Sequence, residues 1–494
     1  MGLLGPVLEF LAVIRRVGLY HLAMTCRFRL HSAPGAFLLL LMLVFPAGPV
    51  LAHASEQGFV LLLPTDAYVV AGAASVALTV LLLTVLPERA LKPVFRPRVL
   101  MRWRPWHRAR LATSILAFLS LCWLIWVGLK GDRDPLENPL SLFVWTIWWI
   151  GFVSVQGVLG NLWRWVNPWT GPVALTRKLL SIRPFLRLPA QMGHVLAILT
   201  FLGFAAVLLA DPAPADPTRL AGYVGGYWLF AYLGLLAFGP RWLLRAEGIS
   251  MLMRNYSRMA LIGRAGRRVA LGVPGWQVLV RRTPPIGVAV FTLLMLGSGS
   301  FDGLNETFWW FGLIGINPLE FPGRSMVITQ NLIGLVIANC ALVAVFVAAV
   351  WMGLKLVDGQ IGLTRAFCLF APTILPIALG YHIAHYLTSF LVDGQYALVA
   401  ISDPLANGAD YLGLGHHFVS TGFFKNQASV RVIWLTQAGV VVAGHILAVM
   451  LAHAIALRQF GTNKRAALSQ APLALFMVLY TLFGLWLLAS PRGG

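Results

Sequence analysis

The sequence predicts an all-α protein, a polytopic transmembrane helix bundle of about ten spans that follow an N-terminal signal-like segment. Three observations predict this class. Charged residues make up 11% of the 494 residues and hydrophobic residues 59%, whereas a soluble domain carries about 25% charge. Apolar runs long enough to cross a bilayer recur along the chain. The loops between these runs alternate in charge, which is the pattern that sets orientation in a membrane.

The N-terminal segment, residues 1–52, has the features of an export signal. Four arginines between positions 15 and 29 precede an apolar run at 36–52. Val50 and Ala52 are small residues at the positions that precede a cleavage site. Cleavage would make His53 the first residue, and its amine and imidazole could then chelate copper. The alternatives are an uncleaved first span and an ordinary residue at position 53.

The rest of the chain, residues 53–494, is predicted to be one membrane domain. Ten of its apolar runs are long enough to span a bilayer. They lie near 68–87, 111–129, 139–161, 191–210, 222–239, 285–304, 331–354, 365–391, 432–457 and 468–490.

Charge in the connecting loops predicts how these spans are threaded. Alternate loops hold 27 Lys and Arg residues and three acidic residues, and the remaining loops hold seven basic and thirteen acidic residues. Because basic loops stay cytoplasmic, we expect a bacterial inner-membrane protein whose mature N-terminus and C-terminus are both periplasmic. The same basic stretches lie beside anionic lipid, so they predict the bilayer as a partner and not nucleic acid.

Buried histidines are the first candidate site. His382 and His385 are three residues apart in the eighth span and therefore share a helix face, and His445 lies in the ninth span. An ionisable side chain inside a membrane needs a partner and is a functional candidate. A divalent ion, zinc or copper, could join His382, His385 and His445, and haem iron is an alternative ligand. Alternatively, each ring bonds to a neighbouring polar group and ties two helices together.

Two carboxylates could complete such a site. Asp302 lies in a polar patch, residues 298–306, that follows the sixth span on the same predicted side of the membrane as the histidines, and Asp393 follows the eighth span. Either carboxylate could orient a metal-activated water or bind the metal. The alternative for Asp302 is a solvated turn at a helix end, because Asp-Gly is a common turn sequence.

Several short motifs occur in an order that resembles a known family. They are Ala52-His53, Asn167-Pro168-Trp169, Ser300-Phe301-Asp302-Gly303, Ala384-His385-Tyr386, Asp403-Pro404-Leu405, Gly444-His445 and Ala452-His453. Between residue 52 and about residue 460, this order resembles the bacterial polytopic membrane proteins labelled fenitrothion hydrolase-like. The resemblance implies membrane-associated hydrolysis of an organophosphate triester. The chain departs from the pattern at Ala454, where an acidic residue is expected.

These observations predict three functions. The first is a metal-assisted hydrolase of apolar, organophosphate-type esters, with an intramembrane histidine site open to the periplasmic side. The second is a membrane protein that binds or transports a metal such as copper, or haem. The third is a structural subunit of a larger membrane complex.

Overall fold

The computed structural model describes residues 60, 63–87, 90–102, 106–320, 323–357, 361–415 and 418–492. In this part of the chain, nine helices are long and apolar enough to cross a membrane. The predicted helical membrane protein is therefore confirmed. The signal-like segment 1–52 and the proposed N-terminal His53 lie outside the described residues.

Each of the nine helices overlaps one of the predicted spans. Seven of them are single helices: α4 (Thr65–Val85), α6 (His107–Lys130), α12 (Pro217–Phe238), α16 (Ile286–Leu304), α18 (Ile328–Lys355), α22 (Gln427–Phe460) and α23 (Asn463–Ala489). The other two each join three consecutive helical segments: α7 (Pro139–Leu142), η1 (Phe143–Phe152) and α8 (Val153–Leu159) form one, and α19 (Leu363–Phe370), η4 (Ala371–Ile374) and α20 (Leu375–His385) form the other. The run predicted at 191–210 forms α11 (Val195–Ala210), whose 16 residues are fewer than an upright span needs.

Shorter helices connect or continue the long ones. They are α5 (Leu91–Val94), α9 (Trp163–Val166), α10 (Thr170–Leu180), α13 (Arg241–Arg245), α14 (Gly248–Tyr256), α15 (Trp276–Val280), α17 (Phe308–Leu313) and α21 (Leu387–Ser402), with 3-10 turns η2 (Pro318–Glu320), η3 (Arg324–Met326) and η5 (Gly422–Lys425). The eighth predicted span, 365–391, is not one helix, because α20 ends at His385 and α21 begins at Leu387.

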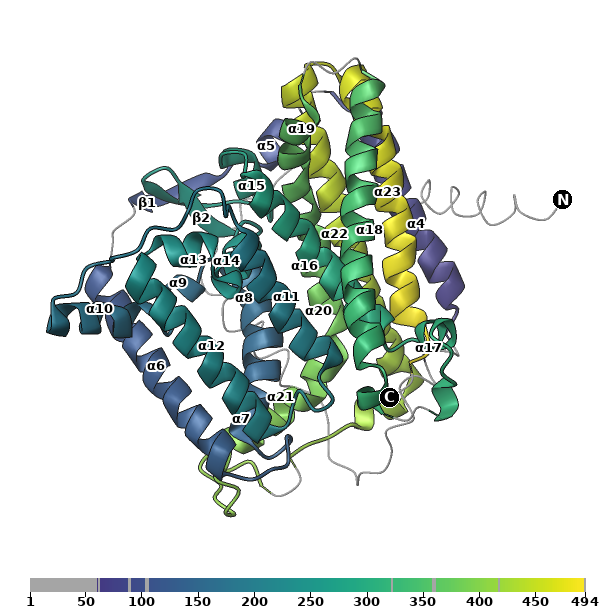
Figure 1. Ribbon diagram of the computed structural model, residues 1–494. Coiled ribbons are helices and arrows are strands. Elements are labelled where there is room, and N and C mark those ends of the chain that lie inside the picture. The colour runs from purple at the N-terminus through teal and green to yellow at the C-terminus, as the bar shows by residue number, and fades with distance from the viewer. Residues whose placement is uncertain are drawn as a thin grey trace, which may run out of the picture. The chain divides into compact units, whose positions relative to one another are not determined.

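A small antiparallel sheet departs from the all-helical expectation. Strands β1 (Arg98–Arg102), β2 (Ile262–Ala265) and β3 (Arg268–Leu271) pair in the order β1-β3-β2. Gly266, at φ +60°, lies in the two-residue turn between β2 and β3, where glycine is favoured. The strands belong to two of the predicted cytoplasmic loops and lie at the end of the bundle that carries α5 and α15 (Figure 1). We call this end the basic end.

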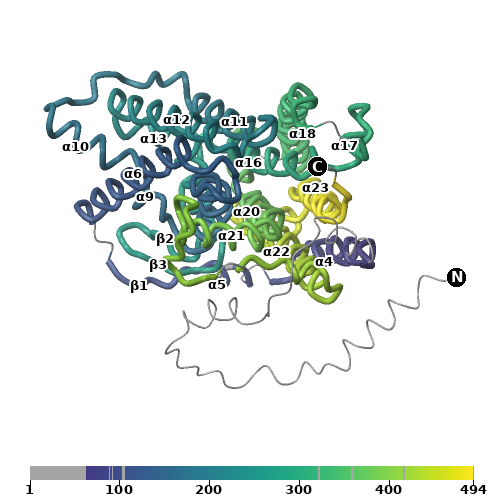
Figure 2. Tube along the Cα trace, turned by 90° about the horizontal axis from the view of Figure 1, so that it is seen from below, coloured from purple at the N-terminus to yellow at the C-terminus, as the bar shows by residue number. Residues whose placement is uncertain are grey.

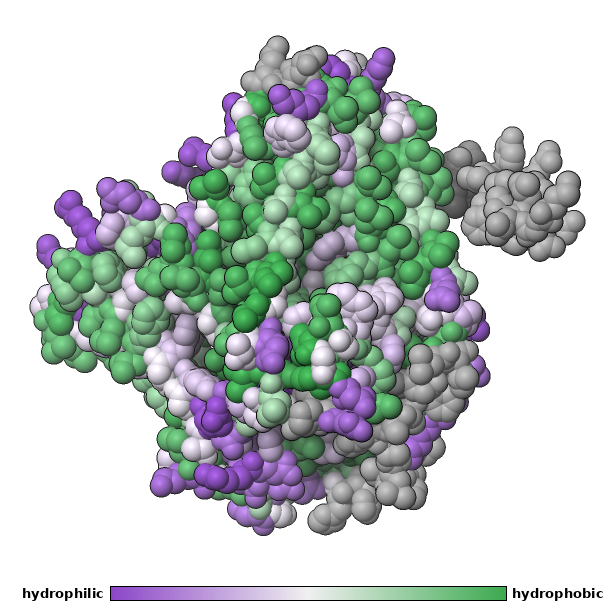
Figure 3. Space-filling view, turned by 45° about the vertical axis from the view of Figure 1, so that its right-hand side comes forward, coloured by the Kyte–Doolittle hydropathy of each residue, from purple (hydrophilic) through white to green (hydrophobic). Residues whose placement is uncertain are grey.

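The centre of the bundle is formed by α20 and α16. In the apolar 18-residue stretch of the α19–α20 span, 89% of the residues are buried inside the protein. The same fraction is 78% for α16 and 17% for α4. The view along the helices places α20 among α16, α21 and α22 (Figure 2). Apolar side chains cover the middle of the face shown in Figure 3, with polar residues towards its upper and lower margins. This distribution is what a bilayer requires.

Two glycines allow α20 and α22 to approach closely. A Cβ atom at Gly444 would lie 2.7 Å from the Pro376 carbonyl oxygen, and one at Gly380 would lie 2.9 Å from the Val440 carbonyl oxygen. Small residues at such crossings let membrane helices pack backbone against backbone. The predicted eighth and ninth spans are therefore direct neighbours.

We expect Gly444→Val to lower the free energy of unfolding by about 1–3 kcal/mol, because the added side chain meets backbone atoms that cannot move aside. The matched control is Gly439→Val on the same helix, where an added Cβ meets no atom within 4 Å. Thermal unfolding of both variants in the same detergent measures the difference. Equal losses in the two variants would contradict this account of the crossing.

Candidate functional site

Asp302 lies in the last turn of α16 but does not face solvent. Its side chain is 12% exposed, and α16 continues to Leu304. The interpretation of Asp302 as a solvated carboxylate in a turn is therefore wrong. A carboxylate in this position requires hydrogen-bond donors, because burial of an unpaired charge is costly.

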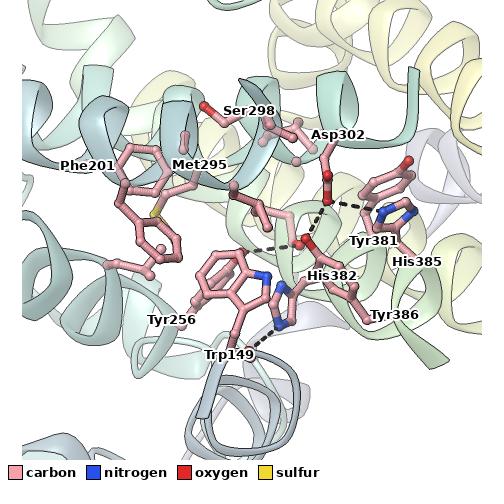
Figure 4. A pocket seen from close by; sticks show the side chains of 18 residues that line it. Trp149, Phe201, Tyr256, Met295, Ser298, Asp302, Tyr381, His382, His385 and Tyr386 are labelled. Atoms are coloured by element: carbon pink, nitrogen blue, oxygen red, sulfur yellow. Dashed lines mark hydrogen bonds and ion pairs between the residues drawn. The ribbon is translucent and has the colours of Figure 1, made fainter. Parts of the chain in front are cut away.

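Two side chains, His385 and Tyr386, bond to this carboxylate (Figure 4). Oδ2 of Asp302 accepts hydrogen bonds from His385 Nε2, at 3.1 Å, and from the Tyr386 hydroxyl. Nη2 of Arg492 lies 3.4 Å from His385 Nδ1. Since a guanidinium can only donate, this contact makes Nδ1 an acceptor and places the ring proton on Nε2. We call Asp302, His385, Tyr386 and Arg492 the buried network.

The break between α20 and α21 positions two members of the network. His385 is the last residue of α20, and Tyr386 is the single residue between the helices. The Tyr381 ring stacks on His385, with centroids 5.5 Å apart and planes 11° apart. At Gly303 a Cβ atom would overlap the Tyr381 hydroxyl, so any larger residue at 303 would displace the ring that stacks on His385.

The segment after α23 brings Arg492 to the site. Arg492 forms an antiparallel bridge with Thr307, and the Phe308 amide donates to the Pro491 carbonyl at 3.1 Å. Thr307 follows α16 by three residues and caps α17 through the Trp310 amide. The bridge therefore attaches the C-terminal segment to the end of α16, next to Asp302.

His382 points to a different neighbour. Its Nε2 donates to the Trp149 carbonyl at 3.0 Å, and its ring meets the Trp149 indole edge-on with centroids 4.9 Å apart. Trp149 lies in η1, a ten-residue π-helical segment. π-helical turns are rare and change which carbonyl groups are available. The ring of His382 is thus held by the backbone of another span.

His445 points to a third neighbour. Its Nδ1 donates to the Val441 carbonyl of its own helix at 2.9 Å. Its ring centroid is 6.4 Å from that of Tyr480 on α23. Among the described residues, Nε2 of His445 has no hydrogen-bond partner.

The predicted metal ligands therefore do not converge. In the described part of the chain, no group of three or more His, Cys, Asp and Glu side chains could hold a metal ion. His382 and His445 each donate one ring nitrogen to a backbone carbonyl, and only His385 meets Asp302. Asp393 lies on α21, half-buried, and does not line the cavity beside Asp302. Among the described residues, these donors therefore form no shared three-ligand zinc or copper site, and we assign no step to a metal.

A small cavity adjoins the buried network, and we call it the polar cavity. Its volume is about 30 Å³. Eight of the side chains that line it carry polar groups, namely Trp149, Tyr256, Ser298, Asp302, Tyr381, His382, His385 and Tyr386, and the rest of its wall is apolar. A water needs roughly 10–15 Å³ of such volume, so the polar cavity has room for about two waters and for no larger molecule.

A much larger apolar groove lies beside the polar cavity, and we call it the outer groove. Its volume is about 960 Å³, and α6, η1, α11 and α12 line it. Three of its lining residues, Leu116, Tyr223 and Phe230, are 64%, 40% and 38% exposed, so the groove opens to the surroundings. Phe204 lines both spaces, and the centroid of its ring lies 4.8 Å from that of the Trp149 ring. These two rings separate the polar cavity from the groove.

No protein-family model matches the chain, and neither a curated protein nor a solved structure matches it. The resemblance to the fenitrothion hydrolase-like proteins therefore stays a prediction that rests on the short motifs.

We expect Tyr386→Phe to cost about 1.5–3 kcal/mol of unfolding free energy, because the lost hydrogen bond ends on a carboxylate. The matched control is Tyr480→Phe, since Tyr480 bonds the neutral hydroxyl of Ser300 at 2.6 Å. That variant should lose only about 0.5–1.5 kcal/mol. Thermal or denaturant unfolding of the two variants measures this difference, and a larger loss in Tyr480→Phe would argue against a charged Asp302.

Proposed function

We propose that the protein is an integral membrane enzyme that hydrolyses an apolar ester, with the Asp302–His385 pair activating a water in the polar cavity. The observation that carries this proposal is a buried carboxylate–imidazole pair that lines a cavity of water size. Groups that can exchange protons are rare inside a bilayer and usually serve a function there.

The reaction needs one proton acceptor and one proton donor. As the water oxygen forms a bond to the phosphorus or carbonyl carbon of the ester, its proton passes to the Asp302–His385 pair. The bond to the leaving oxygen then breaks, and the pair returns the proton to that oxygen. Tyr386 and Arg492 hold the pair in position. General acid–base catalysis of this kind contributes about 10²–10⁴-fold to a rate.

The outer groove supports an apolar substrate. The polar cavity has no room for an ester, so the body of the substrate would lie in the groove. Its reacting group would reach the water after Phe204 moves from its contact with Trp149. An organophosphate-type ester fits this route, and it is also the substrate class that the family resemblance implies.

The orientation of the site follows from the threading. Helix α16 begins beside the basic end at Ile286 and ends at Leu304, which puts Asp302 near the opposite end of the bundle. With basic loops in the cytoplasm, the proposed enzyme lies in a bacterial inner membrane with its buried network towards the periplasm.

The direct test is turnover of a chromogenic phosphotriester and of a matched carboxyl ester by the full chain in lipid nanodiscs. We expect His385→Asn to lower kcat about 10²–10⁴-fold. The matched control is His453→Asn, a buried histidine at the basic end of α22 that contacts Gln470. We expect metal chelators to leave turnover unchanged. Wild-type turnover by His385→Asn would refute the proposal, and loss on chelation would favour metal-assisted hydrolysis instead.

We expect Phe204→Ala to raise kcat/KM for bulky esters several-fold more than for small ones, because it opens the wall between groove and cavity. The control is Phe230→Ala, which enlarges the outer groove without touching the polar cavity. A series of esters of increasing size measures the effect. The same size dependence in both variants would show that Phe204 does not limit access.

A further inference from the structure

Trp149 brings an unused hydrogen-bond donor to the polar cavity. Its side chain lines the cavity, and the residue is only 8% exposed. Within the described part of the chain, its Nε1 has no hydrogen-bond partner. The Tyr386 hydroxyl is near enough to interact with it, but the geometry is not that of a hydrogen bond. Because a buried donor without an acceptor is costly, this nitrogen is available to a molecule that enters the cavity.

The other donors around the cavity are engaged or point elsewhere. Four of them bond to protein acceptors: His385 Nε2 and the Tyr386 hydroxyl to Asp302, the Tyr256 hydroxyl to the Ala378 carbonyl, and His382 Nε2 to the Trp149 carbonyl. The hydroxyl oxygens of Ser298 and Tyr381 point away from Trp149 (Figure 4). Among the described residues that line the cavity, Trp149 therefore retains the donor that a substrate can use.

An unpaired indole nitrogen does not by itself make a site. Nε1 of Trp242 and of Trp434 is also buried without a partner among the described residues, yet neither residue lines the polar cavity. Trp149 differs because it shares the cavity with the Asp302–His385 pair. Figure 4 shows Nε1 on the edge of the indole that faces the Tyr386 hydroxyl and His382.

Contacts on two sides hold the Trp149 ring in place. The His382 ring meets it at 90° with centroids 4.9 Å apart, and the Phe204 ring lies against it at 60°. A donor that is fixed before the reaction stabilises developing charge without a cost of reorganisation. When Phe204 moves to admit an ester, the reacting group of the ester would enter beside the indole.

We propose that Trp149 Nε1 donates a hydrogen bond to the phosphoryl or carbonyl oxygen of the ester as negative charge develops on it. The inference rests on the proposed hydrolysis and narrows the substrate class to esters whose reacting atom carries this oxo oxygen. Sulfur is a weak hydrogen-bond acceptor, so an ester with sulfur in place of the oxo oxygen gains little from the indole.

The charge on the oxo oxygen appears and disappears within one turnover. As the water oxygen bonds to phosphorus or carbon, an electron pair moves onto the oxo oxygen and the water proton moves to the Asp302–His385 pair. When the bond to the leaving oxygen breaks, the electron pair returns from the oxo oxygen, and the pair gives its proton to the leaving oxygen. Trp149 acts between these two events and exchanges no proton.

The test compares oxo esters with their sulfur analogues on the full chain in lipid nanodiscs. One pair is a phosphotriester and its thiophosphoryl analogue, and the other is a carboxyl ester and its thionoester, each with the same leaving group. For the wild type, we expect the oxo-to-sulfur ratio of kcat/KM to exceed that of alkaline hydrolysis of the same pair by about tenfold or more. A ratio equal to the alkaline value would overturn the role of Trp149.

Trp149→Phe should lower kcat for the oxo ester about 10²–10³-fold and bring the ratio down to the alkaline value. The matched control is Trp434→Phe, which removes an equally unpaired and buried indole nitrogen away from the cavity and should leave the ratio unchanged. Because each ratio compares two substrates on one preparation, a loss of folded protein cancels. Equal changes in the ratio for the two variants would contradict the proposal.

The outcomes separate this inference from the hydrolysis itself. Turnover that requires His385 but shows the same ratio in the wild type and in Trp149→Phe would overturn the role of Trp149 and leave the proposed function standing. Absence of ester turnover, or wild-type turnover by His385→Asn, would overturn both.

Discussion

The contact between Asp302 and His385 is the interaction on which the interior of this bundle depends. A carboxylate within the apolar layer is costly unless donors satisfy it, and here an imidazole and a phenol do so. The donors come from the junction of α20 and α21, and Arg492 reaches His385 from the segment after α23. One buried charge thus ties together three parts of the chain that are far apart in sequence.

The long helices could be predicted from sequence because a bilayer leaves few alternatives for an apolar run of about 20 residues. The break at Tyr386 could not, since no proline or glycine lies between Tyr381 and Val392 to mark a helix end. The sheet was also missed. Strand β1 reads Arg-Val-Leu-Met-Arg. Its three apolar residues are consecutive, so it lacks the alternation of apolar and polar residues that predicts a half-buried strand.

The site was predicted only in part. Asp302 and His385 were both candidates, but helix periodicity says which residues share a face and not what the neighbouring helix presents there. His382 bonds the Trp149 carbonyl in a π-helical segment, and the sequence has no simple signal for such a segment. Arg492 lies 107 residues from His385 in sequence, so only the fold could reveal their contact.

The bridge between Thr307 and Arg492 gives the strand-like tail after α23 a role separate from membrane insertion. A protein shortened to end at Ala489 would keep every long apolar helix and could still enter the bilayer. It would nevertheless lack the guanidinium that faces His385. Correct targeting and yield of such a shortened protein would therefore be no guide to whether its interior is intact.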